Sequence, residues 1–534
     1  MIYRASICMA LAISLLLSAC SEDAPPQAPY EVEEISLPQI SADLAAGKTT
    51  SGEITRAYIK RIKTYDHVLN SVIMLAPDAL EQAAASDKRR SAGKPLGPLD
   101  GVPILLKDNI DAMGMPTTAG SFALVENYPP EDAELTRRLR AGGAVILGKL
   151  NLMQFAGFRT AAVFNSSTVG GGTHNPYDLS RDAYGSSSGS GVAGAVSFAA
   201  GTVGSDTDGS ITKPASVNGL VGLRPTVAFI SRRGIVPISH TQDTAGPMTR
   251  TVMGTAMMMT AMTGSDPTDP QSAEADAHKA NFAANLDANA LNGVRLGVLR
   301  GTLDYSETIE PLYNAALKVM QAQGAELVEI PPELLEDLSQ EQLIVLYHEF
   351  KQDLNEYLAK TPPEIQTRSL ADLITFNESD PRENMHDQDI FRAAQATTGY
   401  DSPDYIEARS RGLRKATTEG IDKILADYNV SALLALSKGP GAKLVPDGTI
   451  YEHFITKREA KGSKPPHATT YAAIAGYPVL SVPMGLLENG LPVGISFFGP
   501  AWSDQMLLSL GYAFEQASQA RVPPNAYKQA AKSN

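Results

Sequence analysis

Residues 185–215 read GSSSGSGVAGAVSFAAGTVGSDTDGSITKPA, and this stretch is the most informative about the fold. Two glycine-rich turns, around Ser186 and Ser210, enclose an apolar segment. Glycine adopts backbone conformations closed to other residues and lets a ligand approach the main chain. A flexible Gly/Ser linker has a similar composition, but a solvated linker would not carry flanking residues such as Val192 and Leu220. The stretch therefore predicts two folded turns that present serine hydroxyls.

The composition is that of a globular protein with an acidic balance. The chain has 534 residues, of which 43% are hydrophobic and 19% charged, and its formal net charge is −14. This length permits one large domain or two to three smaller ones. Nucleic-acid binding needs clustered Lys and Arg on the protein surface, so we expect no nucleic-acid partner. The composition leaves the oligomeric state open.

The first twenty residues have the features of an export signal. Arg4 precedes an apolar run over 7–17, which is too short to span a membrane but suits a signal-peptide core. The run ends in LSAC at 17–20, which resembles a bacterial lipobox, where the cysteine is lipidated. We therefore expect residues 1–20 to be a lipoprotein signal peptide with lipidation at Cys20. The alternative is an ordinary secretory signal with a chance cysteine.

The residues after Cys20 predict where the protein is held. Residues 21–38 are rich in Pro, Glu and Asp, which is typical of a flexible tether. Ser21 follows the cysteine where an aspartate would retain the protein at the inner membrane. We expect an exported protein whose only membrane contact is its lipid anchor, on the periplasmic face of the outer membrane.

Cysteine usage and metal motifs exclude two classes of enzyme. The only cysteine besides Cys20 is Cys8, inside the same signal segment. The mature chain would then have no thiol nucleophile, no disulfide and no cysteine metal site. There is also no H-E-x-x-H or comparable ligand cluster. We expect neither a metal nor another cofactor.

Strand and helix patterns alternate along the rest of the chain. A capping box at Thr50–Glu53 opens an amphipathic helix, and the apolar strand 102–106 ends at Lys107. Residues 295–299, 311–321 and 326–330 follow a strand–helix–strand order. This alternation predicts an α/β fold with a large mixed sheet and helices on both faces, built as one large domain.

The expected domain boundaries follow from composition. We assign residues 39–526 to the domain, with 331–430 as a helix-rich region that covers the core and shapes access to it. The stretch 471–498 predicts a return to strands, punctuated by Gly and Pro. Residues 527–534 are expected to be a C-terminal tail.

Serine is a weak nucleophile until a base takes its proton. The sequence offers three arrangements that could activate a serine. Ser187 lies in a G-x-S-x-G pattern, but the residues before it predict a loop, whereas a nucleophile elbow follows a strand. Ser210 and Lys213 form S-x-x-K, but Pro214 disfavours a helical Lys213. Lys107 ends an apolar strand, where burial would lower its pKa toward that of a usable base. A lysine that merely reaches solvent from the strand end is the alternative.

Three motifs together resemble the amidase signature family of serine amide hydrolases. They are Lys107 in GVPILLKD, the GSSSGS turn at 185–190, and DTDGS with PA four residues later at 206–215. The segments 221–250, 368–377 and 471–499 are similar to the branch that includes bacterial peptide amidases. The resemblance covers nearly everything after the expected tether, and it implies the amidase signature fold.

The resemblance also implies a role for each residue of the two turns. Ser210 is the nucleophile, and Ser186, which follows a cis peptide bond in this family, relays protons between Ser210 and Lys107. Lys107, neutral at rest, is the final base and helps to protonate the leaving amine. Asp206 orients the second turn. The backbone N–H groups expected to stabilise the oxyanion belong to Thr207, Asp208, Gly209 and Ser210.

Some positions depart from the commonest family pattern. Asp208 stands where many members have glycine, Thr212-Lys213 replaces a frequent Ile-Arg, and Gly254 replaces an acidic residue. None of these changes removes a catalytic group, so they bear on substrate preference and leave the reaction class unchanged.

The resulting expectation is an amidase that hydrolyses carboxamide C–N bonds through an acyl-enzyme on a Ser–cis-Ser–Lys triad. Its substrates would be C-terminal peptide amides or small amides. One alternative is a glutamine amidase like the glutaminase component of tRNA-dependent amidotransferases, which the export signal disfavours. Another is a solute- or peptide-binding lipoprotein, which would have no need of Lys107, Ser186 and Ser210. A catalytically silent family member is a third.

Overall fold

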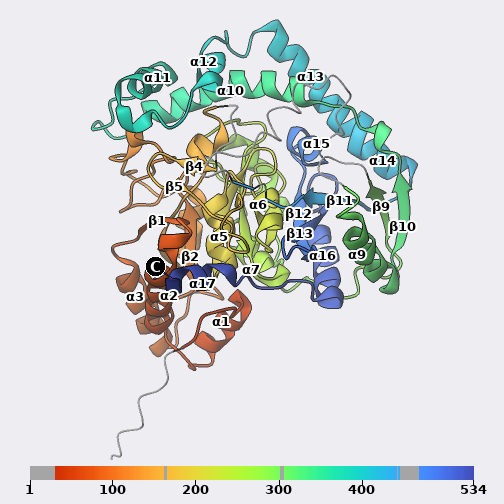
Figure 1. The fold of residues 1–534 in the computed structure, drawn as a ribbon, viewed down its shortest axis with the longest axis horizontal. Helices are drawn as coiled ribbons and strands as arrows, with labels where there is room; N and C mark the ends of the chain where they lie inside the picture. The colour runs from red at the N-terminus through yellow and green to blue at the C-terminus, as the bar shows by residue number, and fades with distance from the viewer. Residues whose placement is uncertain (1–29, 161–164, 301–305, 442, 445–467, 534) are drawn as a thin grey trace, which may run out of the picture.

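An 11-stranded mixed sheet runs through the centre of the molecule (Figure 1). The structure, a computed structural model, describes residues 30–160, 165–300, 306–441, 443–444 and 468–533. The strand order is β1-β3-β2-β6-β8-β7-β12-β13-β11-β9-β10. The strands are β1 (Val72–Leu75), β2 (Pro103–Lys107), β3 (Val145–Leu150), β6 (Gly201–Asp206), β7 (Val221–Arg224), β8 (Thr244–Thr249), β9 (Arg295–Leu299), β10 (Glu326–Ile330), β11 (Ala432–Lys438), β12 (Val479–Leu486) and β13 (Pro492–Phe498).

Parallel and antiparallel pairs alternate in blocks across this sheet. β2 pairs in parallel with β3 and β6, and β9 pairs in parallel with β10 and β11. The other pairs are antiparallel, including β6 with β8 and β12 with β13. Every residue of β2, β3, β6 and β11 is buried, which is expected where helices cover both faces of a sheet. The prediction of an α/β fold with a large mixed sheet is confirmed.

Helices cover both faces of the sheet (Figure 1). α5 and α6 pack against each other and against the central strands. α7 packs on β8 and also contacts α16, α4 and α1. α9 packs on β10 and β12, and α16 packs on β12 and β13. The bounds are α1 (Leu37–Ala45), α2 (Ser51–Tyr65), α3 (Ala79–Ser91), α4 (Glu134–Ala141), α5 (Ser188–Ala195), α6 (Thr212–Val217), α7 (Val252–Met262), α8 (Ala275–His278), α9 (Glu310–Ala322), α16 (Asp504–Ser518) and α17 (Ala526–Ser533).

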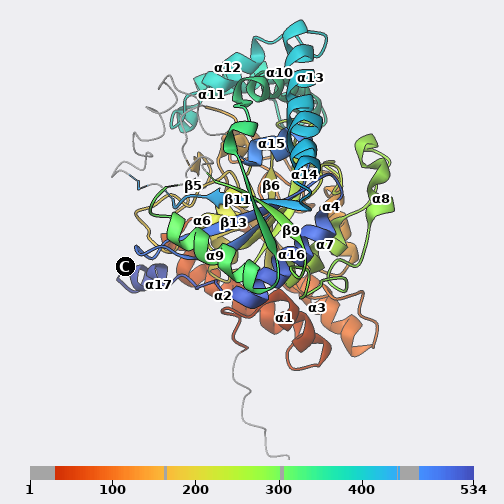
Figure 2. The same ribbon diagram turned by 90° about the vertical axis from the view of Figure 1, so that its right-hand side faces the viewer.

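An arch of helices spans the molecule from the side of β1 to the side of β9 and β10 (Figures 1 and 2). A separate hydrophobic cluster joins the arch to the main body. In it, Phe391 of the arch packs on Phe155, and Phe350 packs on Phe158. The helices of the arch lie within residues 331–430, the region expected to be helix-rich. The arch contains α10 (Ser339–Ala359), α11 (Leu370–Ser379), α12 (Asp389–Gln395), α13 (Pro403–Ala416) and α14 (Asp422–Asp427).

The local helix and strand signals are largely confirmed, with one error. Thr50 caps α2 through a reciprocal capping box with Glu53, and β9 and β10 have the expected bounds. However, the stretch predicted to return to strands from residue 471 begins inside α15 (Ala468–Ala475). Alanine has the highest helix propensity, and the Ala-rich run continues until Gly476, whose φ of +74° ends the helix.

The folded part begins earlier and ends later than the sequence indicated. Val32 is 2% exposed, and α1 begins at Leu37, so the last residues of the predicted 21–38 tether belong to the core. At the other end, α17 packs on α2, and Tyr527 is 1% exposed (Figure 2). The predicted tail at 527–534 is therefore a docked helix as far as residue 533. The predicted signal peptide and Cys20 lie outside the described residues.

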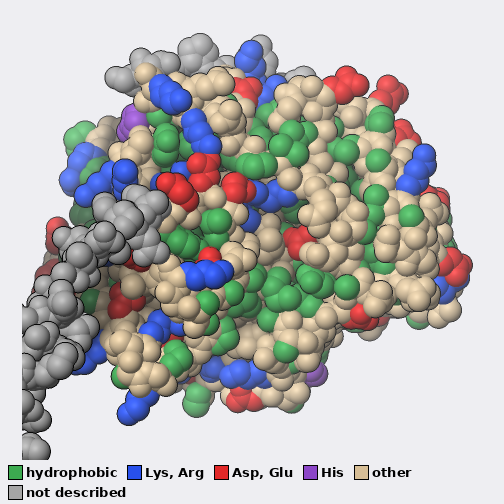
Figure 3. Space-filling model, turned by 90° about the horizontal axis from the view of Figure 1, so that it is seen from below, with side chains coloured by type: hydrophobic (Ala, Val, Ile, Leu, Met, Phe, Trp, Pro, Cys, Tyr) green, Lys and Arg blue, Asp and Glu red, His purple; other side chains and the backbone are tan. Residues whose placement is uncertain are grey.

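None of the helices in the described ranges is long and apolar enough to cross a bilayer. On the face seen in Figure 3, basic and acidic side chains are interspersed rather than gathered by sign.

Candidate active site

Lys107 lies at the end of β2, with its side chain fully buried. Its Nζ lies 2.8 Å from Ser186 Oγ, 2.9 Å from Ser205 Oγ and 3.3 Å from the Ser205 carbonyl oxygen, all within hydrogen-bond distance. Among the described residues no carboxylate lies within ion-pair distance of this amine. The alternative of a lysine reaching solvent is therefore excluded.

The surroundings of Lys107 favour a neutral amine. Burial lowers its pKa from 10.5 to about 7, although the negative charges of Asp206 and Asp243 act in the opposite direction. A neutral amine has two N–H donors and one lone pair. Ser205 can take both N–H groups, through its carbonyl and its hydroxyl, which leaves the lone pair to accept the Ser186 hydroxyl proton. The contacts therefore match a resting base.

The turn that carries Ser186 is tied directly to the turn that carries Ser210. The Gly185–Ser186 peptide bond is cis, as the family resemblance implied. The next residue, Ser187, donates its N–H to the Ser210 carbonyl at 3.3 Å and its hydroxyl to the Ser205 carbonyl at 3.0 Å. Ser187 thus binds the main chain, and no described strand directly precedes it, so the G-x-S-x-G alternative fails.

Asp206 builds the turn that presents Ser210. Its carboxylate accepts the N–H groups of Gly209 and Ile211, each at 2.7 Å. The fully buried Arg224 donates to the Asp206 carbonyl and carboxylate, both at 2.8 Å. Gly209 has a φ of +79°, a conformation that other residues rarely adopt. The turn is therefore held from both sides, with Ser210 half-buried at its end.

The amides expected to stabilise an oxyanion divide into two groups. The Gly209 N–H already serves Asp206, so in this structure it is not directed at a substrate. The Thr207 hydroxyl donates to Asp243 at 2.5 Å, which fixes the start of the turn. The N–H groups of Thr207 and Ser210 have no acceptor within the described ranges. They are the better candidates for the oxyanion.

Lys213 takes a different place from the one the sequence indicated. It is helical, in the first turn of α6, where Pro214 loses no helix hydrogen bond because the first N–H groups have no partner there. The expectation that Pro214 displaces Lys213 from the helix is therefore wrong. Lys213 Nζ donates to the Asp208 carbonyl at 3.0 Å, and the Asp208 carboxylate accepts the Thr470 hydroxyl at 2.7 Å. Lys213 therefore braces the turn, and Lys107 remains the candidate base.

Sequence reasoning missed four residues around the site. Ser205 joins Lys107 to Asn109, whose Nδ2 lies 2.9 Å from Ser205 Oγ. Arg224 and Asp243 hold the Ser210 turn, as described above. One signal was available: Arg224 ends the apolar run 220–223, where a charged residue indicates a buried partner. Ser205 and Asn109 gave no comparable signal.

A cavity of about 350 Å³ opens beside the Ser210 turn. Asn109, Ser205 and Thr207 form its end at the site, and α10 contributes Asp353 and Tyr357 on the opposite side. The arch therefore forms one wall of the space next to the reacting groups.

One group of side chains has the donor atoms of a metal site. Ligand atoms of His240, Glu349 and Asp353 lie within 4.8 Å of one another. Each carboxylate is already satisfied by the protein: Glu349 accepts the Tyr405 hydroxyl at 2.9 Å, and Asp353 accepts the Tyr400 hydroxyl at 2.7 Å. These hydrogen bonds account for the cluster without an ion.

Comparison with known proteins agrees with this geometry. The family model named Amidase matches residues 53–508. The chain belongs to the amidase family. It is accordingly a hydrolase of carboxamide C–N bonds. A probable amidase of Arabidopsis thaliana is 33% identical over 512 residues, covering 93% of this chain and 92% of the relative.

Further relatives extend the comparison to solved structures. A glutamyl-tRNA(Gln) amidotransferase chain of Salinispora arenicola is 33% identical, covering 92% of this amidase and 99% of the relative. The crystal structure of native peptide amidase from Stenotrophomonas maltophilia is 41% identical, with a TM-score of 0.84, covering 92% of this amidase and 98% of that chain. The predicted family, the fold and its similarity to peptide amidase are thereby confirmed.

Proposed function

We propose that this amidase hydrolyses primary carboxamides, at the C-terminus of peptides or in small amides, through an acyl-enzyme on Ser210. The observation that carries the proposal is the fully buried Lys107, without an ion-pair partner in the described structure, whose Nζ lies 2.8 Å from Ser186 Oγ. A lysine in that environment is a base near neutral pH, and the Ser186 turn is hydrogen-bonded to the Ser210 turn.

In the proposed reaction, the Ser210 hydroxyl attacks the amide carbon while its proton moves to Ser186, whose own proton moves to Lys107. Backbone N–H groups of Thr207 and Ser210 stabilise the oxyanion. The tetrahedral intermediate collapses, the C–N bond breaks, and the proton returns through Ser186 to the leaving ammonia. Water then attacks the ester, is deprotonated by the same route, and releases the carboxylic acid and free Ser210. Each proton removed from a nucleophile is thus returned to a leaving group.

The choice of substrate rests on similarity. The similar solved structures include a peptide amidase that is 41% identical to this chain and was crystallised in complex with the competitive inhibitor chymostatin. A panel of peptide amides, fatty amides, aryl amides and glutamine, with ammonia or amine release measured, tests this assignment. We expect peptide or small primary amides to have the highest kcat/KM. Preference for glutamine would instead support the amidotransferase-like alternative.

Two variants test the mechanism. Ser210→Ala should abolish hydrolysis because it removes the nucleophile, whereas Ser188→Ala, two residues beyond Ser186 on α5, should retain it. Ser188 Oγ contacts Thr173 at 3.4 Å and lies outside the proposed proton route. Near-normal turnover by Ser210→Ala would refute the assignment.

We also propose that the protein is exported and held by a lipid on Cys20. The support is the sequence at 1–20 alone, with its apolar core and its LSAC end. Metabolic labelling with a palmitate precursor should mark the wild-type chain and not Cys20→Ala. Unmodified wild-type protein recovered free from the periplasm would contradict the anchor.

A further inference from the structure

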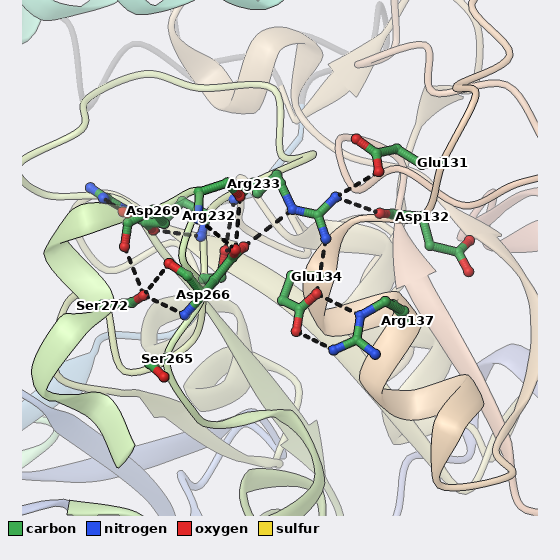
Figure 4. Close-up of polar contacts among 12 residues, drawn as sticks. Glu131, Asp132, Glu134, Arg137, Arg232, Arg233, Ser265, Asp266, Asp269 and Ser272 are labelled. Carbon is green, nitrogen blue, oxygen red and sulfur yellow. Dashed lines mark hydrogen bonds and ion pairs between the residues drawn. The ribbon is translucent and has the colours of Figure 1, made fainter. Parts of the chain in front are cut away.

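The cavity beside the Ser210 turn has a strongly acidic lining. Its three Lys or Arg residues are each ion-paired with carboxylates. Figure 4 shows the two arginines directed at these carboxylates. The pairs are Arg232 with Asp269, Arg233 with Glu131, Glu134 and Asp266, and Lys360 with Glu356. The cations of this wall are therefore neutralised by their neighbours.

Three further carboxylates of the cavity have no Lys or Arg partner, and one of them, Asp353, is paired with His240. Although burial acts to lower it, the pKa of His240 is raised by its carboxylate neighbours. Asp111, Asp243 and Asp353 line the cavity, and no Lys or Arg in the described parts of the chain lies within ion-pair distance of them. Asp111 accepts the Tyr357 hydroxyl at 3.0 Å, and Asp353 lies 3.0 Å from the ring nitrogen of His240. Burial raises the pKa of Asp111 and of Asp243 to about 6, so both are ionised at pH 8. The space between the site and α10 therefore carries excess negative charge.

An independent observation indicates that this space receives a hydrogen-bond donor. Asn109 lines the cavity and is 1% exposed, and its Nδ2 is used by Ser205. Its Oδ1 is buried and has no hydrogen-bond partner among the described residues. A buried carbonyl oxygen without a donor costs stability unless a ligand or water supplies one. Asn109 and Asp111 lie two and four residues after Lys107, so one short segment carries both the candidate base and two side chains of the cavity lining.

We propose that this cavity recognises a positively charged nitrogen group on the amide substrate. Asn109 Oδ1 accepts an N–H from the substrate, and Asp111, Asp243 and Asp353 provide the complementary charge. The inference rests on the proposed function and deepens it: the preferred substrates are amides that carry an ammonium or guanidinium group. Anionic amides are disfavoured, because every cation of the cavity wall is already paired.

A matched set of substrates tests the charge preference. The α-amides of Nα-acetyl-arginine, Nα-acetyl-citrulline and Nα-acetyl-glutamate carry a positive, neutral and negative side chain, and arginine and citrulline are nearly isosteric. At pH 8 and low salt we expect kcat/KM to fall in that order, by about three- to tenfold per step, as for partly exposed charge pairs. The differences should shrink in 0.5 M NaCl because salt screens them. Equal values, or a preference for the glutamate amide, would overturn the proposal.

Two variants locate the preference in the cavity. Asp111→Asn and Asp353→Asn should each reduce the arginine-to-citrulline ratio of kcat/KM by about threefold, mainly through a higher KM for the arginine amide. Glu407→Gln removes an exposed carboxylate of α13 outside the cavity and should leave the ratio unchanged. An unchanged ratio in both aspartate variants, or an equal fall in Glu407→Gln, would refute the location.

A binding experiment separates this proposal from the failure of the proposed reaction. Calorimetry with Ser210→Ala measures the affinity for the arginine and citrulline amides without turnover. Tighter binding of the arginine amide, weakened by Asp111→Asn, supports the charged cavity even if the wild-type enzyme hydrolyses neither. Hydrolysis of both amides with equal affinities would retain the amidase function and overturn the charge preference.

Discussion

Lys107 and Lys149, two buried lysines of the central sheet, should respond in opposite ways to substitution by methionine. Lys107 has no ion-pair partner in the described structure, whereas Lys149 on β3 lies 3.1 Å from the buried carboxylate of Asp108. Methionine is similar in length and carries no charge. Lys107→Met should abolish activity yet raise the stability of the fold at pH 7, while Lys149→Met should lower it.

The magnitude follows from the pKa of Lys107. Folding lowers this pKa from 10.5 to about 7, and at about 1.4 kcal/mol per pKa unit the fold loses about 4 kcal/mol of stability at pH 7. Methionine removes that cost but leaves the hydrogen-bonding groups of Ser186 and Ser205 without the amine, at about 1 kcal/mol each. The net stabilisation is about 2 kcal/mol. Lys149→Met leaves the Asp108 charge unpaired, which costs about 3–5 kcal/mol.

The pH dependence gives the sign of the effect. Because the folded pKa is depressed, the wild type gains stability as pH rises from about 7 to 10.5, where the unfolded lysine also loses its proton. The advantage of Lys107→Met should therefore be full below pH 7 and fade toward pH 10. Thermal unfolding of the wild type and both variants at pH 7 and pH 10 checks this. A Lys107→Met variant less stable than the wild type by the same amount at both pH values would contradict a lowered pKa of Lys107 in the folded protein.

Three further predictions follow from the same geometry. With Nα-acetyl-citrulline amide, which does not titrate, kcat/KM should rise about 90-fold from pH 5 to pH 8 and then level off, because the neutral fraction of a base of pKa about 7 does so; a continued tenfold rise per pH unit above 8 would indicate an ordinary lysine. Asp206→Asn should lower kcat by about 10²-fold with little change in KM, because it loosens the oxyanion turn and leaves the buried Arg224 unpaired; steady-state kinetics would contradict this if only KM changed. Glu383→Gln should destabilise the protein by about 3–5 kcal/mol, because Glu383 is the buried partner of Arg159 between the arch and the main body; denaturant unfolding that matches the exposed-site variant Glu407→Gln would contradict it.

Much of this fold could be predicted because its signals are local. The apolar strand ending at Lys107 and the capping box at Thr50 each lie in a few consecutive residues, and the structure reproduces them. The α15 segment was predicted wrongly because its short apolar, Ala-rich sequence suits either a helix or a buried strand. The outer boundaries were missed because Val32 and Tyr527 are buried by residues far away in the chain.

The site was less accessible to sequence reasoning than the fold. Lys107, Ser186 and Ser210 could be assigned through family resemblance, and the structure brings their segments together. Ser205 and Asn109 could not, because their importance depends on strand pairing: β2 and β6 are parallel neighbours, which places Ser205 against the Lys107 amine. Single polar residues at strand ends carry no periodic signal that indicates such a contact.

The residue that carries the acyl group shows which serine is the nucleophile. Rapid quenching of the enzyme with an activated ester, p-nitrophenyl butyrate, followed by peptide mapping, locates any acyl group on the chain. We predict one butyryl group on Ser210, absent from Ser210→Ala and accumulating when the proton relay is removed in Ser186→Ala. Acylation of Ser186 or Ser187, or amide turnover by Ser210→Ala, would contradict the assignment of Ser210 as the nucleophile.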